Sequence, residues 1–180
     1  ENTLTNFPVP FGIAPNFRIN DMVYAVPMVI EESSVVAAAS NAAKYWITRG
    51  GFKAEVLSTT KVGQVHFTYA GPKRKLFSFF DSIKHELKQG IKHITAKMEE
   101  RGGGVLDMEL FDYTNLEKDY YQLRVKFETV DSMGANFINS CLEEFGNMLQ
   151  QKVAASDEFT GADKELDIVM CILSNYTPEC

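Results

Sequence analysis

The chain has 180 residues, of which 45% are hydrophobic and 23% are charged, and its formal net charge at pH 7 is −6. These proportions are ordinary for a globular protein, the acidic balance argues against nucleic acid as a main partner, and no apolar run approaches the ~20 residues of a membrane-spanning helix. The three cysteines show no metal-ligand spacing, and their odd number indicates free thiols in a reducing, cytoplasmic setting rather than a disulfide framework.

The first part of the chain predicts a β-hairpin followed by a helix. Asn20-Asp21 separates two apolar runs, which is the pattern of two strands joined by a tight turn. A segment rich in alanine and valine then predicts a helix over about residues 34–49, and Gly50-Gly51 supplies its C-terminal stop.

Two adjacent carboxylates, Glu31 and Glu32, stand between the second strand and this helix. We expect that strand to be buried, and carboxylates at the end of a buried strand are costly because desolvation disfavours their charged forms. Ser33 and Ser34 are good N-cap residues for the helix. One of the two glutamates is therefore a candidate general acid or base, and the alternative is that both only complement the helix dipole.

The rest of the chain predicts alternating strands and helices. Residues 64–69 alternate polar and apolar as a strand does, and apolar residues at helical spacing from Leu76 to Met98 predict one long amphipathic helix that Gly102-Gly103-Gly104 ends. Strands over 105–112 and 121–128, a helix over about 133–152 and a strand over 166–173 follow. The order β-α-β-β-α-β is that of a ferredoxin-like split βαβ sheet with two helices on one face, so the predicted fold class is α+β.

Segment 131–136 lies where a predicted strand gives way to a helix N-terminus. Unpaired backbone N–H groups at such a place favour anions, and Gly134 would let a phosphate approach closely. The alternative is an ordinary N-cap at Asp131 followed by a tolerated glycine. The segment is not a Rossmann fingerprint, because the chain has no G-x-G-x-x-G motif after a strand.

The three histidines of the chain do not predict a metal site. His66, His85 and His93 have no Cys, Asp or Glu at metal-ligand spacing, and we expect them at the surface. Asn175 follows the last predicted strand, and the simplest interpretation is a strand-end asparagine in a turn.

Five segments together resemble one enzyme family. They are residues 1–2, 31–43, 102–104, 131–136 and 172–175, and they occur in the family's order with almost gapless spacing. The chain is thus similar to class II 3-hydroxy-3-methylglutaryl-CoA reductase, the soluble bacterial type. The resemblance implies reduction of 3-hydroxy-3-methylglutaryl-CoA to mevalonate and free CoA, in isoprenoid metabolism, with two hydrides from NADH or NADPH. The competing hypothesis is a non-catalytic ferredoxin-like module that binds a small molecule or a CoA ester.

The resemblance also implies roles for individual residues. Glu32, the second of the two carboxylates, aligns with the catalytic acid, and burial would need to raise its pKa to suit that role. Ser34 and Asn175 match substrate-binding positions. The cofactor contacts that carry over are Gly103, Gly104, Asp131, Met133, Gly134 and Asn136.

Thr95 departs from the family pattern. Relatives that use NADH carry an aspartate at this position, seven residues before the glycine triplet, where it accepts a hydrogen bond from the ribose 2′-hydroxyl. A partly exposed threonine with Lys92, His93 and Lys97 nearby would tolerate a 2′-phosphate, so NADH and NADPH both stay open and Thr95 is expected to help set the preference. The alternative is that these basic residues form only a solvated helix face.

The domain organisation follows from the same resemblance. Residues 1–55 would form part of a large α/β substrate-binding domain, 56–168 an inserted cofactor-binding domain, and 169–180 the return strand into the large domain. The family's catalytic lysine, second catalytic aspartate and C-terminal histidine would lie beyond residue 180. We therefore expect a fragment that is inactive alone, cut from an enzyme that forms a homodimer or higher homo-oligomer.

Overall fold

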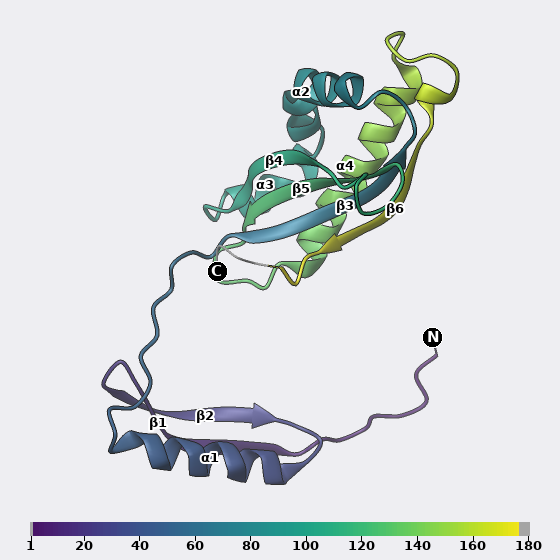
Figure 1. Cartoon of the computed structure of the whole chain (residues 1–180). Coiled ribbons are helices and arrows are strands. Elements are labelled where there is room, and N and C mark those ends of the chain that lie inside the picture. Colours follow the sequence, from purple (N-terminus) through teal and green to yellow (C-terminus); the bar gives the residue numbers. More distant parts are fainter. Residues whose placement is uncertain (1, 177–180) are drawn as a thin grey trace. The chain divides into compact units, whose positions relative to one another are not determined.

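The computed structural model describes residues 2–176, and the chain divides into two compact units, 1–56 and 57–180 (Figure 1). The elements in chain order are β1 (Phe11–Ile19), β2 (Met22–Val29), α1 (Ser33–Ile47), β3 (Lys61–Tyr69), α2 (Lys73–Gly90), α3 (Lys92–Glu99), β4 (Gly104–Asp112), β5 (Tyr120–Glu128), α4 (Ala135–Ala155), the 3₁₀-helix η1 (Gly161–Lys164) and β6 (Leu166–Leu173). Residue 1 and residues 177–180, which the sequence predictions include, lie outside the described part.

The first unit is an antiparallel hairpin with one helix packed on it. The turn between β1 and β2 falls at Asn20-Asp21 as predicted, and both residues have positive φ (48° and 69°), as a tight hairpin turn requires. The backbone N–H of Phe52 donates to the Arg18 carbonyl oxygen (2.7 Å), which ties the segment after α1 back to the hairpin.

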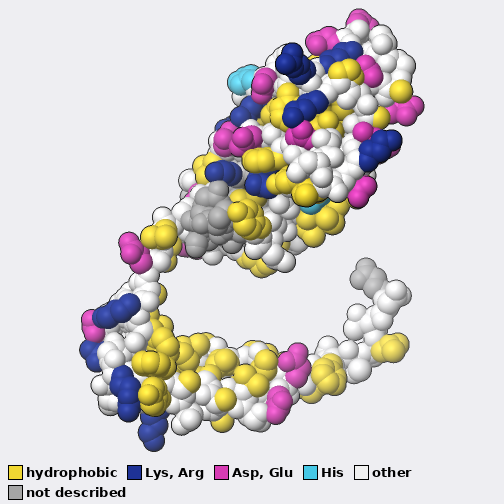
Figure 2. Space-filling view, viewed as in Figure 1, with side chains coloured by type: hydrophobic (Ala, Val, Ile, Leu, Met, Phe, Trp, Pro, Cys, Tyr) yellow, Lys and Arg dark blue, Asp and Glu magenta, His cyan; other side chains and the backbone are white. Residues whose placement is uncertain are grey.

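The expectation that the strand before Glu31 is buried is wrong in this chain. Ala14 and Ala43 are the only hydrophobic residues in the described part of the first unit that are buried. Large apolar side chains of the hairpin lie in solvent instead (Figure 2). Phe11 is 70% exposed, and Met22, Val23 and Val29 are each 62% exposed. The physical reason is that one hairpin and one helix are too few layers to enclose a core.

The second unit is a four-stranded antiparallel sheet, with strand order β4-β5-β3-β6, that carries α2, α3 and α4 on one face (Figure 1). The α+β fold class and the predicted order of the strands are confirmed, with two helices, α2 and α3, where the sequence predicted one. Alternate residues of the two central strands face the helices and are fully buried, as the period of two predicts. These residues are Val65, Phe67, Leu123, Val125 and Phe127.

The predicted long helix is two helices, α2 and α3, that meet at Ile91. The apolar face is continuous as predicted, from Leu76 through Leu87 to the fully buried Ile91. The break follows Gly90, where a Cβ atom would stand 2.2 Å from Met148 of α4. Ile91 has φ −91° and ψ 5°, which ends α2 while its side chain stays in the core. Periodicity could not reveal this break, because both helices present their apolar residues to the same core.

β6 is a continuous edge strand of this sheet. A domain boundary at residue 168 would fall inside it, whereas the compact unit runs from Leu57 past its end. The backbone N–H of Ser174 donates to the Val62 carbonyl oxygen (2.8 Å), so the chain stays attached to β3 beyond β6. The assignment of substrate and cofactor roles to the two units stays a prediction.

The second unit has one buried thiol, Cys141, and one partly buried thiol, Cys171. Both are free; burial raises the pKa of Cys141 to about 12, and burial followed by the nearby Glu143 charge raises the pKa of Cys171 to about 11. Within residues 2–176 no group of three or more His, Cys, Asp or Glu side chains could hold a metal ion. No helix in the same range is long and apolar enough to cross a membrane.

Candidate functional site

The two glycine-containing segments predicted to contact a cofactor meet at one end of the four-stranded sheet. Gly104 opens β4 and pairs with Glu128, the last residue of β5, so the glycine triplet stands beside the loop that follows β5. A Cβ on Gly103 would lie 2.6 Å from the Glu128 carbonyl oxygen, a distance that only glycine avoids. Strand pairing therefore brings together two segments that are far apart in the sequence.

Glu128 holds this junction in place. One of its carboxylate oxygens accepts a hydrogen bond from Thr59 Oγ1 (2.6 Å), and the other accepts one from the Val130 backbone N–H (2.7 Å). Both hydrogen bonds hold the pKa of Glu128 below its usual value, and the one from Thr59 has the larger effect. Val130 has φ 54°, which is rare for a β-branched residue, so the loop after β5 is strained and is kept in shape by its neighbours.

Thr129 closes the same loop. Its hydroxyl donates to the Ser132 carbonyl oxygen, and the Ser132 hydroxyl donates to the Thr129 carbonyl oxygen, both at 2.7 Å. Gly134 has φ 75°, and a Cβ there would lie 2.5 Å from Thr129 Cγ2. The sequence suggested that the small size of Gly134 serves a phosphate. The structure gives it another reason, because the missing side chain makes room for Thr129.

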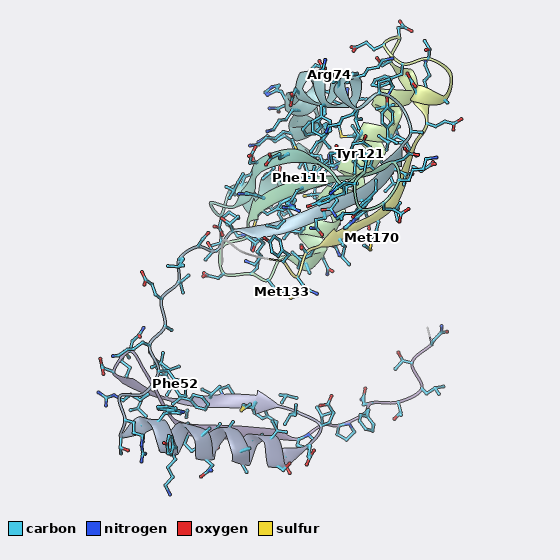
Figure 3. The ribbon with its side chains drawn as sticks, in the orientation of Figure 1. Phe52, Arg74, Phe111, Tyr121, Met133 and Met170 are labelled. Atoms are coloured by element: carbon cyan, nitrogen blue, oxygen red, sulfur yellow. The ribbon has the colours of Figure 1, made fainter. Side chains whose placement is uncertain are left out.

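The N-terminus of α4 carries no side-chain cap. The N-cap position is Gly134, and Asp131, the alternative cap considered from the sequence, is exposed in the preceding turn. The first N–H groups of a 21-residue helix are therefore open to an anion. Met133, which is 72% exposed, lies at the tip of the loop (Figure 3), and the exposed Asn136 lies in the first turn of α4.

The glycine triplet ends α3 and leaves space beside it. The N–H of Gly103 donates to the Met98 carbonyl oxygen and that of Gly102 to the Glu99 carbonyl oxygen, both at 2.9 Å, in a Schellman arrangement. Gly102 has φ 89°, and its Cβ position meets no atom within 4 Å. The sequence assigned close cofactor approach to Gly103 and Gly104, but the glycine beside open space is Gly102.

Thr95 is buried, which contradicts the expectation of a partly exposed side chain. It is 1% exposed, and its Oγ1 donates to Glu99 Oε1 (2.7 Å), while Lys92 Nζ bonds the other carboxylate oxygen (2.6 Å). The group that reaches the surface is therefore the Glu99 carboxylate, whose Cγ lies 3.0 Å from the Cβ position of Gly104. Sequence reasoning missed Glu99, although its i, i+4 spacing from Thr95 was a usable signal.

Thr95→Asp is accordingly expected to destabilise the second unit rather than to change cofactor preference. It would bury a second carboxylate against Glu99, at a cost of ~3 kcal/mol or more in unfolding free energy. Thermal unfolding followed by circular dichroism measures the effect. Thr95→Val keeps the shape and loses only the hydroxyl, so it should cost ~1 kcal/mol. An unchanged midpoint for Thr95→Asp would mean that this side of α3 is open.

Glu32 and Ser34 meet at the start of α1 in the first unit. The N-cap is Glu32 rather than a serine, and Ser34 Oγ donates to Glu32 Oε1 (2.5 Å). Both residues are exposed, as is Glu31, so the burial expected for Glu32 is not present in this chain. A groove of about 360 Å³ between β1 and α1 reaches Ser33, beside this pair.

Two further expectations have different outcomes. His66 is half-buried rather than fully exposed: on the uncovered face of the sheet its Nδ1 lies 2.6 Å from the Tyr120 hydroxyl, and burial lowers its pKa. His85 and His93 are exposed as predicted. Asn175 lies exposed in the bend after β6, as the simpler interpretation predicted, and its role in substrate binding stays a prediction.

Comparisons with known proteins agree with this architecture. A family model described as hydroxymethylglutaryl-coenzyme A reductase matches residues 1–180. The chain is 32% identical over 152 residues to 3-hydroxy-3-methylglutaryl-coenzyme A reductase of Archaeoglobus fulgidus, covering 84% of this chain and 35% of the relative. It is 31% identical over 170 residues to a probable 3-hydroxy-3-methylglutaryl-coenzyme A reductase of Borreliella burgdorferi, covering 89% and 38%. The chain therefore belongs to the hydroxymethylglutaryl-coenzyme A reductase family, whose named members are oxidoreductases.

Solved structures narrow the similarity to one class of that family. The 3-hydroxy-3-methylglutaryl-coenzyme A reductase of Streptococcus pneumoniae superposes with a TM-score of 0.79 at 30% identity, covering 99% of this chain and 40% of that one. A class II reductase structure from the same organism, bound to NADPH in open conformations, gives a TM-score of 0.76 at 31% identity with the same coverage. The chain thus spans well under half the length of these relatives.

Proposed function

We propose that this chain carries the catalytic glutamate and the nicotinamide-dinucleotide site of a class II 3-hydroxy-3-methylglutaryl-CoA reductase. The whole enzyme would reduce 3-hydroxy-3-methylglutaryl-CoA to mevalonate and CoA with two NADH or NADPH, as a cytoplasmic homodimer or higher homo-oligomer. The observation that carries the proposal is the junction of segments 102–104 and 131–136 through the pairing of Gly104 with Glu128, beside an uncapped helix N-terminus.

The residues at this junction suit a dinucleotide. The free N–H groups at the start of α4 would hold phosphate oxygens, and the open space at Gly102 would let the pyrophosphate approach the backbone. Met133 offers an exposed, polarisable thioether to a planar ring, and Asn136 offers an amide on the same helix turn. The dinucleotide, when bound, supplies the hydride.

Glu99 bears on the choice between the two dinucleotides. Its carboxylate beside Gly104 could accept a hydrogen bond from a ribose 2′-hydroxyl, and it would repel a 2′-phosphate. Lys92 pairs with the same carboxylate and offsets part of that repulsion. Both cofactors therefore belong to the proposal, and the NADPH bound to the pneumococcal relative supports the second.

Glu32 is the proposed proton donor to the substrate oxygen that gains charge as the hydride is transferred. Its exposure here means that the rest of the enzyme would have to cover it before its pKa could rise toward the operating pH. Ser34 already donates to one Glu32 oxygen and leaves the other free. Ser34 is therefore placed to orient the carboxyl group as well as to contact substrate.

Calorimetric titration of the 180-residue chain with NADH and with NADPH tests the proposed site. We expect weak, saturable binding of at least one of them, accompanied by a rise in thermal midpoint, because a ligand that binds only the folded state stabilises it. Inorganic pyrophosphate is the control ligand, and it should bind more weakly because it lacks the rings and riboses. The absence of both heat and thermal stabilisation with either dinucleotide would contradict the proposal.

A further inference from the structure

The face of the four-stranded sheet that the helices leave uncovered carries a row of stacked rings. Phe111, Tyr113, Tyr120 and His66 follow one another across β4, the β4–β5 connection, β5 and β3, and Figure 3 shows Phe111 on this face. Neighbouring ring centroids are 6.4, 5.8 and 6.0 Å apart, with interplanar angles of 19°, 29° and 13°. All four rings are half-buried. A sheet face that only meets water does not need such a row, because its outward positions are ordinarily polar.

Arg124 of β5 lies over one end of this row. Its guanidinium carbon is 4.1 Å from the centroid of the Phe111 ring, and its Nη2 donates to the Tyr113 hydroxyl (2.7 Å). Glu109 stands opposite Arg124 in the β4–β5 register, and the two side chains line a small hollow together with Phe111. The half-buried Arg124 guanidinium, which contacts a ring and a tyrosine hydroxyl, supplies the positive charge that an anion in this place would need.

A pocket of about 490 Å³ opens beside Arg124, within the size range of small-molecule sites. It is lined by Gln64, Tyr113, Leu116, Tyr120, Gln122, Arg124 and Tyr176. This lining contains one cation, three tyrosines and two amides, and no carboxylate. The Tyr113 hydroxyl accepts from Arg124 and keeps its own proton to donate, and Gln122 Nε2 donates to the Tyr120 hydroxyl (2.5 Å).

Two buried atoms at the same place are unsatisfied. Among the described residues, His66 Nε2 and Arg124 Nε find no hydrogen-bond partner, and a buried polar atom without a partner costs free energy. The Tyr120 hydroxyl connects the two side chains, because it lies 2.6 Å from His66 Nδ1 and accepts from Gln122, which neighbours Arg124. A molecule that reorganises this small network would therefore gain hydrogen bonds as well as ring contacts.

We propose that this pocket binds a small planar aromatic anion of the size and chemistry of a nucleoside monophosphate. The ring would stack on the tyrosines, the Gln64 amide would hydrogen-bond the ring edge, and the phosphate would pair with Arg124. The net charge of −6 excludes a polynucleotide as the natural occupant, because such ligands require many cationic contacts.

This pocket is separate from the proposed dinucleotide site. Arg124 lies opposite Glu109 in the strand register, in the middle of β5, whereas the dinucleotide site lies at the end of β5, where Glu128 is opposite Gly104. Four residues of a strand span ~13 Å, and the two sites also differ in the part of the sheet that they use. The α4 N-terminus belongs to the side of the sheet that the helices cover, and the pocket to the uncovered face.

Titration of the ¹⁵N-labelled 180-residue chain with three probes tests the proposal by magnetic resonance. AMP carries both ring and phosphate, adenosine only the ring, and inorganic phosphate only the anion. We expect AMP to shift the side-chain signals of Gln64, Gln122 and Arg124 Nε–H with saturation, and adenosine to do so more weakly. No saturable shift on this face with AMP would overturn the proposal, as would AMP shifts confined to segments 102–104 and 131–136.

Three variants sharpen the test. Arg124→Gln should weaken AMP binding by ~10-fold or more while leaving adenosine binding within about twofold, because only AMP uses the charge. Tyr176→Ala, at a side chain that is 60% exposed and so tolerates truncation, should weaken both probes. Arg74→Gln makes the same charge change on the exposed side of α2 and should alter neither (Figure 3). Equal AMP affinity for Arg124→Gln and Arg74→Gln, or displacement of AMP by NADH at a shared site, would refute the proposed pocket.

Discussion

Glu32→Gln in the complete enzyme is expected to lower kcat by ~10²–10⁴-fold while leaving KM for 3-hydroxy-3-methylglutaryl-CoA within a few-fold. Glutamine keeps the shape of the side chain and can still accept the hydrogen bond that Ser34 Oγ now gives to Glu32 Oε1. It cannot donate a proton as a carboxylic acid does, so the loss should fall on the chemical step rather than on binding. Steady-state kinetics of the purified full-length variant measure both constants.

Glu31→Gln is the matched control for this experiment. Glu31 is also exposed and adjacent in sequence, but it precedes the N-cap position that Glu32 occupies and receives no hydrogen bond from Ser34. It should therefore retain kcat within a few-fold. A larger loss for Glu31→Gln than for Glu32→Gln would show that Glu31, and not Glu32, is the acid. Similar small losses for both variants would show that neither glutamate is the acid.

Gly134→Ala is expected to weaken dinucleotide binding by more than ~10-fold. The residue has φ 75°, where a side chain is strained, and the new Cβ would lie 2.5 Å from Thr129 Cγ2. Relief of this clash must move Thr129 or the start of α4, and either movement redirects the N–H groups that would hold the phosphates. Calorimetric titration with NADPH and NADH measures the loss, and circular dichroism checks that the fold is retained.

Two further variants separate loop geometry from backbone strain. Gly161 also has positive φ (56°), but its Cβ position meets nothing within 4 Å, so Gly161→Ala carries similar strain without a clash and should bind dinucleotide normally. Adding Thr129→Ser to Gly134→Ala removes the clashing Cγ2 and keeps the hydroxyl that bonds the Ser132 carbonyl oxygen, so binding should partly return. Wild-type affinity of Gly134→Ala alone would show that the loop does not contact the cofactor.

Much of the fold could be predicted because the sequence patterns that indicate its strands and turns are local. Residues 121–128 alternate strictly and form β5, and the Asn20-Asp21 pair gives the hairpin turn of the first unit. The break between α2 and α3 is marked in the sequence only by Gly90, a residue that weakens a helix without necessarily ending it. The burial of the strand before Glu31 was predicted wrongly because the described part of the first unit offers its apolar residues no second layer.

The candidate site likewise combines features that the sequence could predict with features that depend on tertiary contacts. The segments 102–104 and 131–136 could be found from the sequence by family resemblance, but that they meet depends on the pairing of Gly104 with Glu128. Glu128 carries no motif, and its importance follows only from its bonds to Thr59 and Val130. Thr95 was interpreted as a surface residue because its neighbours are basic, whereas the helix turns it into the core beside Glu99.

Segments 102–104 and 131–136 are proposed to form one dinucleotide site, and mapping of the binding site by magnetic resonance is the most direct test of this. The ¹⁵N-labelled 180-residue chain is titrated with NADPH and with NADH while the backbone amide signals of Gly102, Gly103, Ala135 and Asn136 are followed. For the dinucleotide that binds, we predict that all four signals shift together along one saturation curve with a single dissociation constant. Shifts confined to one of the two segments, or curves with clearly different constants for each, would contradict a shared site.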